Sequence, residues 1–323
     1  MGLDSYVVLV IADDEDTSAD AVVEELERRP VGVARLNTAD FPRHVGLIAM
    51  FGCPTPTMRL CWGGRELDMT TVRSIYRRSP AAFDLAEGMS VVERRFAMGE
   101  AVQGLGGALA GLDCRWVNHP ARVADATYKP HQLRVAAACG LRVPRTLITN
   151  RVDAAAEFAT GCGHGIVYKP MANGMFTEEG EFKVINTQRL AVADLDEVPI
   201  GRTACQFQEW VPKAFDVRLT VVGEQFFAVA IDAGSEESSV DWRADYTALS
   251  YRIVPVPPAV RQGVTAYLGT FDLAYAALDF GVTADGVWWF YEANPNGQWE
   301  WIAEATGVPI AAALADHLAK ENP

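Results

Sequence analysis

Residues 274–294 read AYAALDFGVTADGVWWFYEAN, two apolar stretches separated by an Asp-Gly pair at 285–286. A pair of this kind between apolar runs predicts a β-hairpin. The first strand carries Asp279, and the second carries Glu292 and Asn294, which lie two residues apart and share one face. Three oxygen donors that converge in an apolar hairpin suit Mg²⁺, which proteins hold with few ligands beside substrate phosphates. The alternative is that these side chains only satisfy turns and backbone amides at the strand ends.

The composition is that of an ordinary soluble enzyme, with half of the 323 residues hydrophobic and 22% charged. This length allows two domains, or one domain with an inserted lobe. The net charge of −14 argues against a nucleic-acid-binding protein, because no basic stripe is present to neutralise phosphates. No apolar run reaches the length of a membrane span, and residues 1–6 lack the features of a signal peptide, so we expect a cytoplasmic protein.

The six cysteines and five histidines are scattered along the chain, without a Cys-x-x-Cys pair. A zinc site needs clustered ligands of these types, so we expect none. The cysteines are interpreted as reduced thiols that serve as small core residues. The sequence also lacks a Gly-x-Ser-x-Gly motif and a glycine-rich loop between a strand and a helix, so the predicted chemistry is electrostatic handling of phosphates.

Two regions of different pattern follow one another. In residues 1–120, apolar strands and helices alternate, which predicts a small α/β domain. After residue 120, several helices are mixed with short antiparallel strands, which predicts an α+β region with two small sheets. Strands are expected in the first region at 7–11, 31–36 and 72–76, with a long helix at 91–109; in the second, strands are expected at 166–169, 205–211, 217–222 and 226–231, and helices at 130–139, 153–160, 258–268 and 309–320.

Two lysines occupy positions that favour the binding of an anion. Lys169 ends the apolar strand 166–169 just before Pro170, and a lysine there is costly to desolvate unless an anion meets it. The alternative is a lysine whose amine reaches solvent at the sheet rim. Lys129 comes directly before the proline that opens the next helix, where backbone amides also favour anions.

Three further groups are candidates for ligand contacts. The segment QEWV at 208–211 ends a strand before a proline, which leaves backbone groups that can read an adenine edge. Asp216 and Arg218 alternate along a strand and share the face opposite the apolar positions, although such pairs are often structural. Arg243, in the polar loop Asp241-Trp242-Arg243, offers a second anion clamp with a weaker signal.

Taken in order, these residues resemble the ATP-grasp superfamily over about residues 121–320. The branch that the chain resembles most is that of the ATP-grasp ligases that mature ribosomal peptides, the microviridin-type or graspetide synthetases. Residues 1–120 resemble the N-terminal domain of that branch, including ARLNTADFP at 34–42 and IYRR at 75–78. The motifs that carry the resemblance are Lys129, Tyr168-Lys169-Pro170, Gln208-Glu209-Trp210-Val211, Asp216-Val217-Arg218, Asp279 and Glu292-Ala293-Asn294.

The resemblance implies an α/β N-terminal domain followed by an α+β ATP-grasp domain, whose two subdomains clasp ATP. The expected boundaries are a pre-ATP-grasp domain at 1–120, a central subdomain with a peptide-binding hairpin at 121–205, and a C-terminal subdomain with the magnesium site at 206–323. Residues 171–176, with Gly174, are expected to form a flap over the phosphates.

The resemblance also implies a role for each candidate residue. ATP would be bound by Lys129, Lys169, Gln208, Glu209, Trp210, Val211 and Asp216, with adenine read through the backbone of Glu209 and Val211. Magnesium would be held by Asp279, Glu292 and Asn294. Lys169, Arg218 and Arg243 would act in catalysis, the two arginines by holding the acceptor carboxylate. The leader of a precursor peptide would contact the segment around Phe182, Lys183, Val184 and Asn186.

The function implied is an ATP- and Mg²⁺-dependent ligase that phosphorylates Asp or Glu side chains of a ribosomal precursor peptide. Attack by a Thr or Ser hydroxyl would close an ester ring, and attack by a Lys amine would close an amide ring, with ADP and phosphate released. The partners expected are the leader and core of that peptide, and a second copy of the chain in a homodimer. Two alternatives stay open: an amino-acid or glutamate ligase of the type that modifies ribosomal protein tails, and a nucleotide-binding regulator without turnover.

Overall fold

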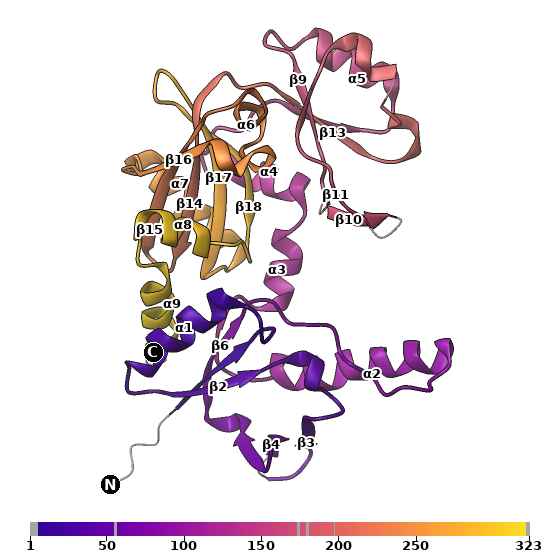
Figure 1. The fold of residues 1–323 in the computed structure, drawn as a ribbon, viewed down its shortest axis with the longest axis vertical. Helices are drawn as coiled ribbons and strands as arrows, with labels where there is room; N and C mark the ends of the chain where they lie inside the picture. The colour runs from indigo at the N-terminus through magenta and orange to yellow at the C-terminus, as the bar shows by residue number, and fades with distance from the viewer. Residues whose placement is uncertain (1–5, 55–56, 173–174, 179–180, 197, 321–323) are drawn as a thin grey trace.

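The computed structural model describes residues 6–54, 57–172, 175–178, 181–196 and 198–320. Its N-terminal part forms one end of an elongated molecule, and a five-stranded sheet with its helices forms the body above it (Figure 1). A smaller sheet with one helix lies to the side of that body, at the end far from the N-terminal part. In the part of the chain that the structure describes, no helix combines the length and hydropathy needed to cross a bilayer.

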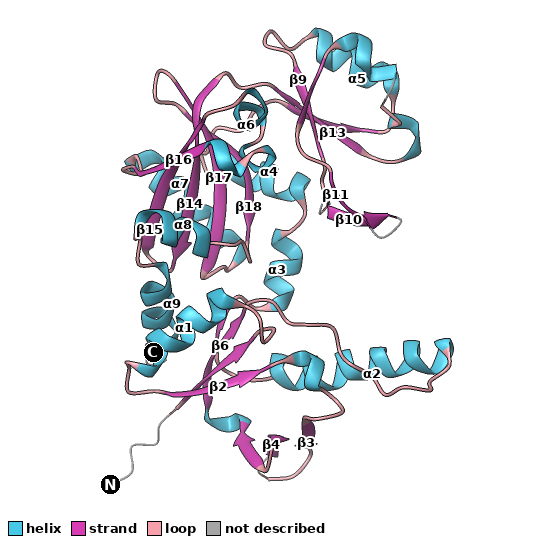
Figure 2. Ribbon diagram, viewed as in Figure 1, coloured by secondary structure: helices cyan, strands magenta, loops and turns pink. Residues whose placement is uncertain are grey.

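The N-terminal part is an α/β unit around a parallel sheet in the order β2-β1-β6-β7. The central strand β1 is apolar and almost wholly buried, because it is covered on both faces. A second sheet of three strands packs beside it, and the long helix α2 projects from this unit (Figure 2). The elements are β1 (Val7–Ile11), α1 (Thr17–Glu27), β2 (Gly32–Leu36), β3 (Gly46–Met50), β4 (Thr57–Trp62), β5 (Arg65–Asp68), β6 (Val72–Arg77), α2 (Val91–Ala110) and β7 (Arg115–Val117).

Two helices, α3 (Pro120–Ala126) and α4 (Lys129–Ala138), lead from this unit to the smaller antiparallel sheet. That sheet has the order β12-β9-β13-β8, and a separate hairpin of β10 and β11 lies beside it. Its apolar side is closed by α5, whose Ala155 and Ala159 pack against Phe207 of the sheet. The elements are β8 (Thr146–Thr149), α5 (Val152–Thr160), β9 (Ile166–Lys169), β10 (Met175–Glu178), β11 (Glu181–Val184), β12 (Gln188–Leu190) and β13 (Cys205–Glu209).

The five-stranded antiparallel sheet has the order β16-β15-β14-β17-β18. On one face, side chains such as Val217, Leu219 and Leu278 pack against α4 and α7. The opposite face is covered in part by α8 and α9, which also contact α1 and so join the sheet to the N-terminal unit. The elements are β14 (Lys213–Val222), β15 (Gln225–Ala233), α6 (Glu236–Val240), β16 (Leu249–Ile253), α7 (Pro258–Phe271), β17 (Tyr275–Thr283), β18 (Trp288–Asn294), α8 (Glu300–Thr306) and α9 (Ile310–Leu318).

The predicted hairpin of residues 274–294 is confirmed as β17 and β18, with a bulge next to Asp279. The alternation predicted for Asp216 and Arg218 is also confirmed, since the intervening Val217 belongs to the apolar face. The strand predicted at 205–211 ends at Glu209, two residues early, because the chain turns there toward β14. Elements that the sequence pattern did not predict include β3, α3, β12, α6, β16 and α8.

Candidate active site

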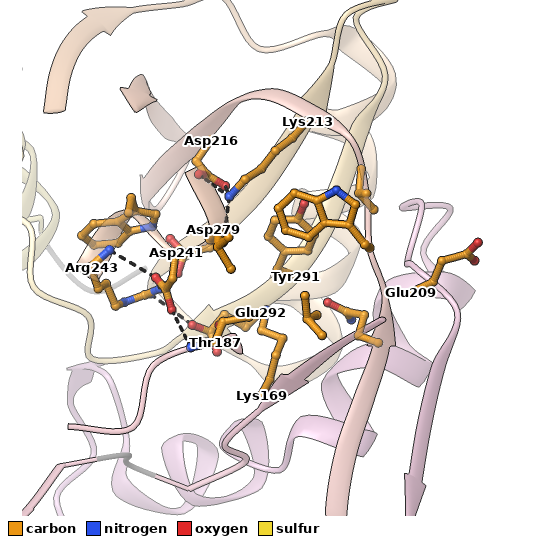
Figure 3. Close-up of a pocket in the computed structure, with 16 residues that line it drawn as sticks. Lys169, Thr187, Glu209, Lys213, Asp216, Asp241, Arg243, Asp279, Tyr291 and Glu292 are labelled. Carbon is orange, nitrogen blue, oxygen red and sulfur yellow. Dashed lines mark hydrogen bonds and ion pairs between the residues drawn. The ribbon is translucent and has the colours of Figure 1, made fainter. Parts of the chain in front are cut away.

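A polar cavity lies where the smaller sheet meets the uncovered part of the five-stranded sheet (Figure 3). Strands β9 and β13 form one wall, strands β14, β17 and β18 form the other, and the loop after α6 lies across it. Its lining includes most of the residues that the sequence predicted for a nucleotide site: Lys169, Gln208, Glu209, Trp210, Val211, Asp216, Arg243, Asp279 and Glu292.

Asp279 is the buried acid at the centre of this cavity. Its Oδ1 accepts a hydrogen bond from Arg218 Nη1 at 2.9 Å, and its Oδ2 accepts one from Arg243 Nη2 at 2.6 Å. Burial alone would raise the pKa of Asp279, but the two guanidinium charges and their hydrogen bonds outweigh it and lower the pKa to about 2. The side chain is therefore a carboxylate that two arginines share.

Glu292 lies directly opposite Asp279 on the neighbouring strand. It forms an ion pair with Lys129, and its Oε1 accepts a hydrogen bond from Arg243 Nη2 at 3.2 Å. One nitrogen of Arg243 thus lies within hydrogen-bond distance of both acids. Carboxylate oxygens that reach one cationic atom can also reach one metal ion, so this pair fits the one or two carboxylates with which proteins hold Mg²⁺.

Asn294, the third predicted magnesium ligand, follows Glu292 on the same strand. Its side-chain oxygen accepts a hydrogen bond from the amide of Asn296 at 2.9 Å, and it does not line the cavity. Among the described residues, no group of three or more His, Cys, Asp and Glu side chains is placed to hold a metal. The acids that a magnesium ion would meet in this cavity are therefore Asp279 and Glu292, and the role of Asn294 stays a prediction.

Two lysines face this acidic pair from different elements. Lys129 opens α4, and burial, with the nearby charge of Lys169 as the next cause, lowers its pKa to about 8. Lys169 ends β9 with its Nζ 4.7 Å from the ring centroid of Tyr291, and burial likewise lowers its pKa to about 8. Ammonium groups that lose stability on burial gain from a bound polyanion, which is what a triphosphate provides.

The QEWV segment forms the side of the cavity where β13 ends. The side chain of Glu209 points away from the other labelled residues, whereas the segment itself borders the cavity (Figure 3). Gln208 Nε2 donates to Thr146 Oγ1 at 2.9 Å, and the Trp210 ring is 4.8 Å from the Arg189 guanidinium. A segment that turns its acidic side chain outward is placed to offer its backbone to a ligand.

The lining residues to which the sequence predictions gave no role include Thr187, Lys213 and Tyr291. Lys213 Nζ contacts both oxygens of Asp216, at 2.8 and 2.6 Å, and the pair is buried. Burial raises the pKa of Asp216 to about 6, although the charge of Lys213 opposes that rise. Residues three apart in a regular strand point to opposite faces, so the spacing of Lys213 and Asp216 gave no signal. Their contact occurs where the pairing of β14 with β17 is irregular, between Lys213 and Phe215.

Asp241 and its neighbour Arg243 bring the loop after α6 into the site. Asp241 Oδ2 accepts from the amide of Thr187 at 3.1 Å, which ties this loop to the chain that follows β11. Asp241 Oδ1 accepts from Arg243 Nη1 at 3.3 Å, and the guanidinium also lies 4.3 Å from the Trp242 ring. Arg243 is therefore held from three sides before any ligand is bound.

The predicted peptide-binding residues are not part of this cavity. Phe182, Lys183 and Val184 belong to β11, and Asn186 follows it in the loop before β12. Lys183 and Val184 are exposed, and Asn186 is partly buried. Of the predicted flap at 171–176, Gly174 lies outside the described residues, and residues 175–176 begin β10.

Residues 7–124 match the family model described as the MvdD pre-ATP grasp domain. A solved RiPP-associated ATP-grasp ligase from Chryseobacterium gregarium, in complex with ADP and a leader and core peptide, is similar over 98% of both chains, with a TM-score of 0.89 and 24% identity. The macrocyclase MdnC from Microcystis aeruginosa MRC, bound with precursor peptide MdnA, is similar over 98% of this chain and 99% of its own, with a TM-score of 0.84 and 26% identity. The ATP-grasp ligase PsnB, complexed with a phosphomimetic variant of its minimal precursor, Mg and ADP, is similar over 98% of both chains, with a TM-score of 0.76 and 24% identity.

A comparison with curated proteins found no match. The solved structures confirm the expected ATP-grasp fold, and the match at the N-terminus confirms the resemblance to the peptide-maturing branch. The nucleotide and magnesium present in these relatives agree with the cofactors expected, ATP and Mg²⁺.

Proposed function

We propose that the chain is an ATP-dependent ligase that closes rings in a ribosomal precursor peptide, because residues 7–124 match the MvdD pre-ATP grasp model and the whole chain is similar in fold to ATP-grasp macrocyclases. The observation that carries this proposal is the group of four cations around two carboxylates at a cavity between two sheets, namely Lys129, Lys169, Arg218 and Arg243. Such a group suits a reaction that the negative charge of its reactants slows. Its cations can neutralise a triphosphate and can also bind the peptide carboxylate that is activated.

The reaction needs two steps because a carboxylate is a poor target for a hydroxyl. Transfer of the γ-phosphoryl group of ATP to an Asp or Glu side chain gives an acyl phosphate and ADP. A Thr or Ser hydroxyl of the same peptide then attacks the acyl carbon, forms the ester, and releases phosphate as its proton is lost. A Lys amine would form an amide by the same route, and tethering both groups on one chain favours ring closure.

In this proposal the residues in and beside the cavity have separate roles. Lys129 and Lys169 would neutralise the phosphates, the 208–211 segment and Asp216 would hold the nucleoside, and Asp279, Glu292 and Asn294 would hold Mg²⁺. The ion supplies charge neutralisation of the phosphate oxygens. We also propose that the three divisions at 1–120, 121–205 and 206–323 act as separate parts, with residues 182–186 contacting the leader.

Arg243 has a further part in this scheme. Its Nη2 stands between the two carboxylates that would hold the metal. Arg243 would give up these carboxylate oxygens when they hold a metal, and its guanidinium would turn away from them. It would then be available for the carboxylate of the peptide, beside Arg218.

The experiment uses the full chain, Mg²⁺, ATP, a mixture of free amino acids and a candidate precursor peptide from a short reading frame beside the gene, with the product measured by mass spectrometry. The proposal expects the peptide to lose one water per ring, with one ADP formed for each. A peptide that gains the mass of an amino acid would favour the tail-modifying type of ligase. ATP and peptide that both stay unchanged would contradict the proposal and favour a regulator.

A further inference from the structure

The loop that follows the proposed magnesium strand is fixed in an unusual way. Residues 295–298 read PNGQ, and we call them the 295–298 loop. Each of its four successive carbonyl oxygens accepts a hydrogen bond from a different buried side chain. The donors are Asn118 to Pro295, Arg78 to Asn296, Tyr275 to Gly297 and Arg218 to Gln298, at 2.7, 3.1, 2.6 and 3.0 Å.

Two of these donors come from the pre-ATP-grasp domain, to which the proposed function assigns no residue of the active site. Arg78, from the IYRR motif, is only 3% exposed. Its Nε donates to Ser18 Oγ at 3.1 Å, its Nη1 also lies 3.4 Å from Asn296 Oδ1, and its own carbonyl accepts from Asn296 Nδ2. A buried guanidinium of this kind orients the backbone that it contacts, because turning it away would leave a charge without partners.

Asn118 is the second donor from this domain and is also 3% exposed. Its Nδ2 bonds both the Pro295 and the Tyr275 carbonyls, and its Oδ1 accepts from the amides of Ala274 and Tyr275 at 2.9 and 3.1 Å. One side chain thereby ties the start of β17 to the 295–298 loop. The loop is thus held in a fixed position beside β17, the strand that carries Asp279.

The same loop contacts two residues of the proposed reaction. The carbonyl of Gln298 holds Nη2 of Arg218, whose Nη1 bonds Asp279. The amide of Asn296 donates to the side-chain oxygen of Asn294. The fit is close, since a Cβ on Gly297 would lie 2.8 Å from Arg218 Nη2 and 2.6 Å from Ala277 Cβ.

From these contacts we propose that Arg78 and Asn118 are positioning residues for the metal and acceptor sites, acting through the 295–298 loop on Asn294 and Arg218. The pre-ATP-grasp domain then completes the active site of the second half of the chain, besides any contact with peptide. This inference rests on the proposed function. It predicts that loosening the loop weakens metal binding, because partners one shell beyond the ligands tune metal affinity about 10-fold or more.

The test measures Mn²⁺ as a probe of the magnesium site, by electron paramagnetic resonance with ADP present and without peptide. The variants are Arg78→Lys, which keeps the charge but cannot reach all its partners, and Tyr275→Phe, which removes one hydroxyl from the same loop. The matched control is Thr17→Val, which removes the contact of Thr17 Oγ1 with Glu300 between the same two domains without touching the loop.

The inference expects the Kd for Mn²⁺ to rise about 10-fold in both loop variants and to stay unchanged in Thr17→Val. Wild-type Mn²⁺ affinity in a folded Arg78→Lys protein, or in Tyr275→Phe, would overturn it. Tyr275→Phe decides the test if Arg78→Lys fails to fold, because Tyr275 bonds the same loop. Failure of wild type to bind Mn²⁺ with ADP would also overturn it. A wild type that binds Mn²⁺ and ADP but leaves every peptide unchanged would count against the proposed function alone.

Discussion

Replacing Lys169 with methionine should make the ligand-free protein more stable while it removes nucleotide binding. The lysine is partly buried near other cations, and burial lowers its pKa from 10.5 to about 8. At about 1.4 kcal/mol per pKa unit, keeping this ammonium group charged in the folded protein at pH 7 costs about 3 kcal/mol. Methionine removes that cost but also the contact with Tyr291, worth about 0.5 to 1 kcal/mol, so we expect a net gain of about 2 kcal/mol.

The dependence on pH has a defined sign. Because the pKa of Lys169 is lowered in the folded protein, the unfolded chain binds this proton more tightly between pH 8 and pH 10.5. The wild type therefore gains stability as the pH rises through that window, and the advantage of the variant shrinks. The Lys169→Met variant does not gain this stability as the pH rises, because methionine does not titrate.

The assay is urea denaturation of both proteins at pH 7 and pH 10, followed by circular dichroism, with ADP binding measured by calorimetry at pH 7. Lys320→Met, at an exposed lysine, is the matched control and should change the free energy of unfolding by less than about 0.5 kcal/mol. A Lys169→Met protein less stable than wild type at pH 7 would refute the reasoning. So would an advantage of the same size at both pH values.

Three other predictions concern single features of the site and the assembly. Asp279→Asn should lower the free energy of unfolding in urea by about 3 to 5 kcal/mol, because the buried Arg218 and the partly buried Arg243 lose their shared counter-charge, and it should abolish Mg²⁺-dependent turnover; an unaltered urea midpoint would contradict this. Gly281→Ala puts a Cβ 2.1 Å from the Tyr291 hydroxyl, so the ring must move and calorimetry should show weaker ADP binding; wild-type affinity would argue against a role for that ring. Light scattering should give about twice 35.1 kDa for the expected homodimer, and a monomer mass would exclude it.

The sequence predicted those parts of the site that depend on local pattern. A turn at 285–286 between two apolar runs is enough to pair β17 with β18, and the bulge next to Asp279 then sets this residue opposite Glu292. Alternation along β14 likewise placed Asp216 and Arg218 on the polar face. In each case the residues that matter lie within one strand or one hairpin.

The parts that were missed depend on contacts between distant segments. Asp241 lies in a loop whose place is fixed by the Thr187 amide, and nothing in the spacing of the two residues indicates that they meet. Arg78 and Asn296 are separated by 218 positions, and Asn118 and Pro295 by 177. Patterns of period two or 3.6 carry no information about such pairs, because they arise from how domains pack.

The most direct test of the account follows the oxygen atoms of the peptide. Carboxylates of the candidate precursor are labelled with ¹⁸O, and the phosphate released during ring closure is examined by mass spectrometry. If the enzyme forms an acyl phosphate, each ring leaves one ¹⁸O in inorganic phosphate, because that oxygen departs with the phosphoryl group. Rings that close with unlabelled phosphate, or phosphate released without any ring, would contradict the account.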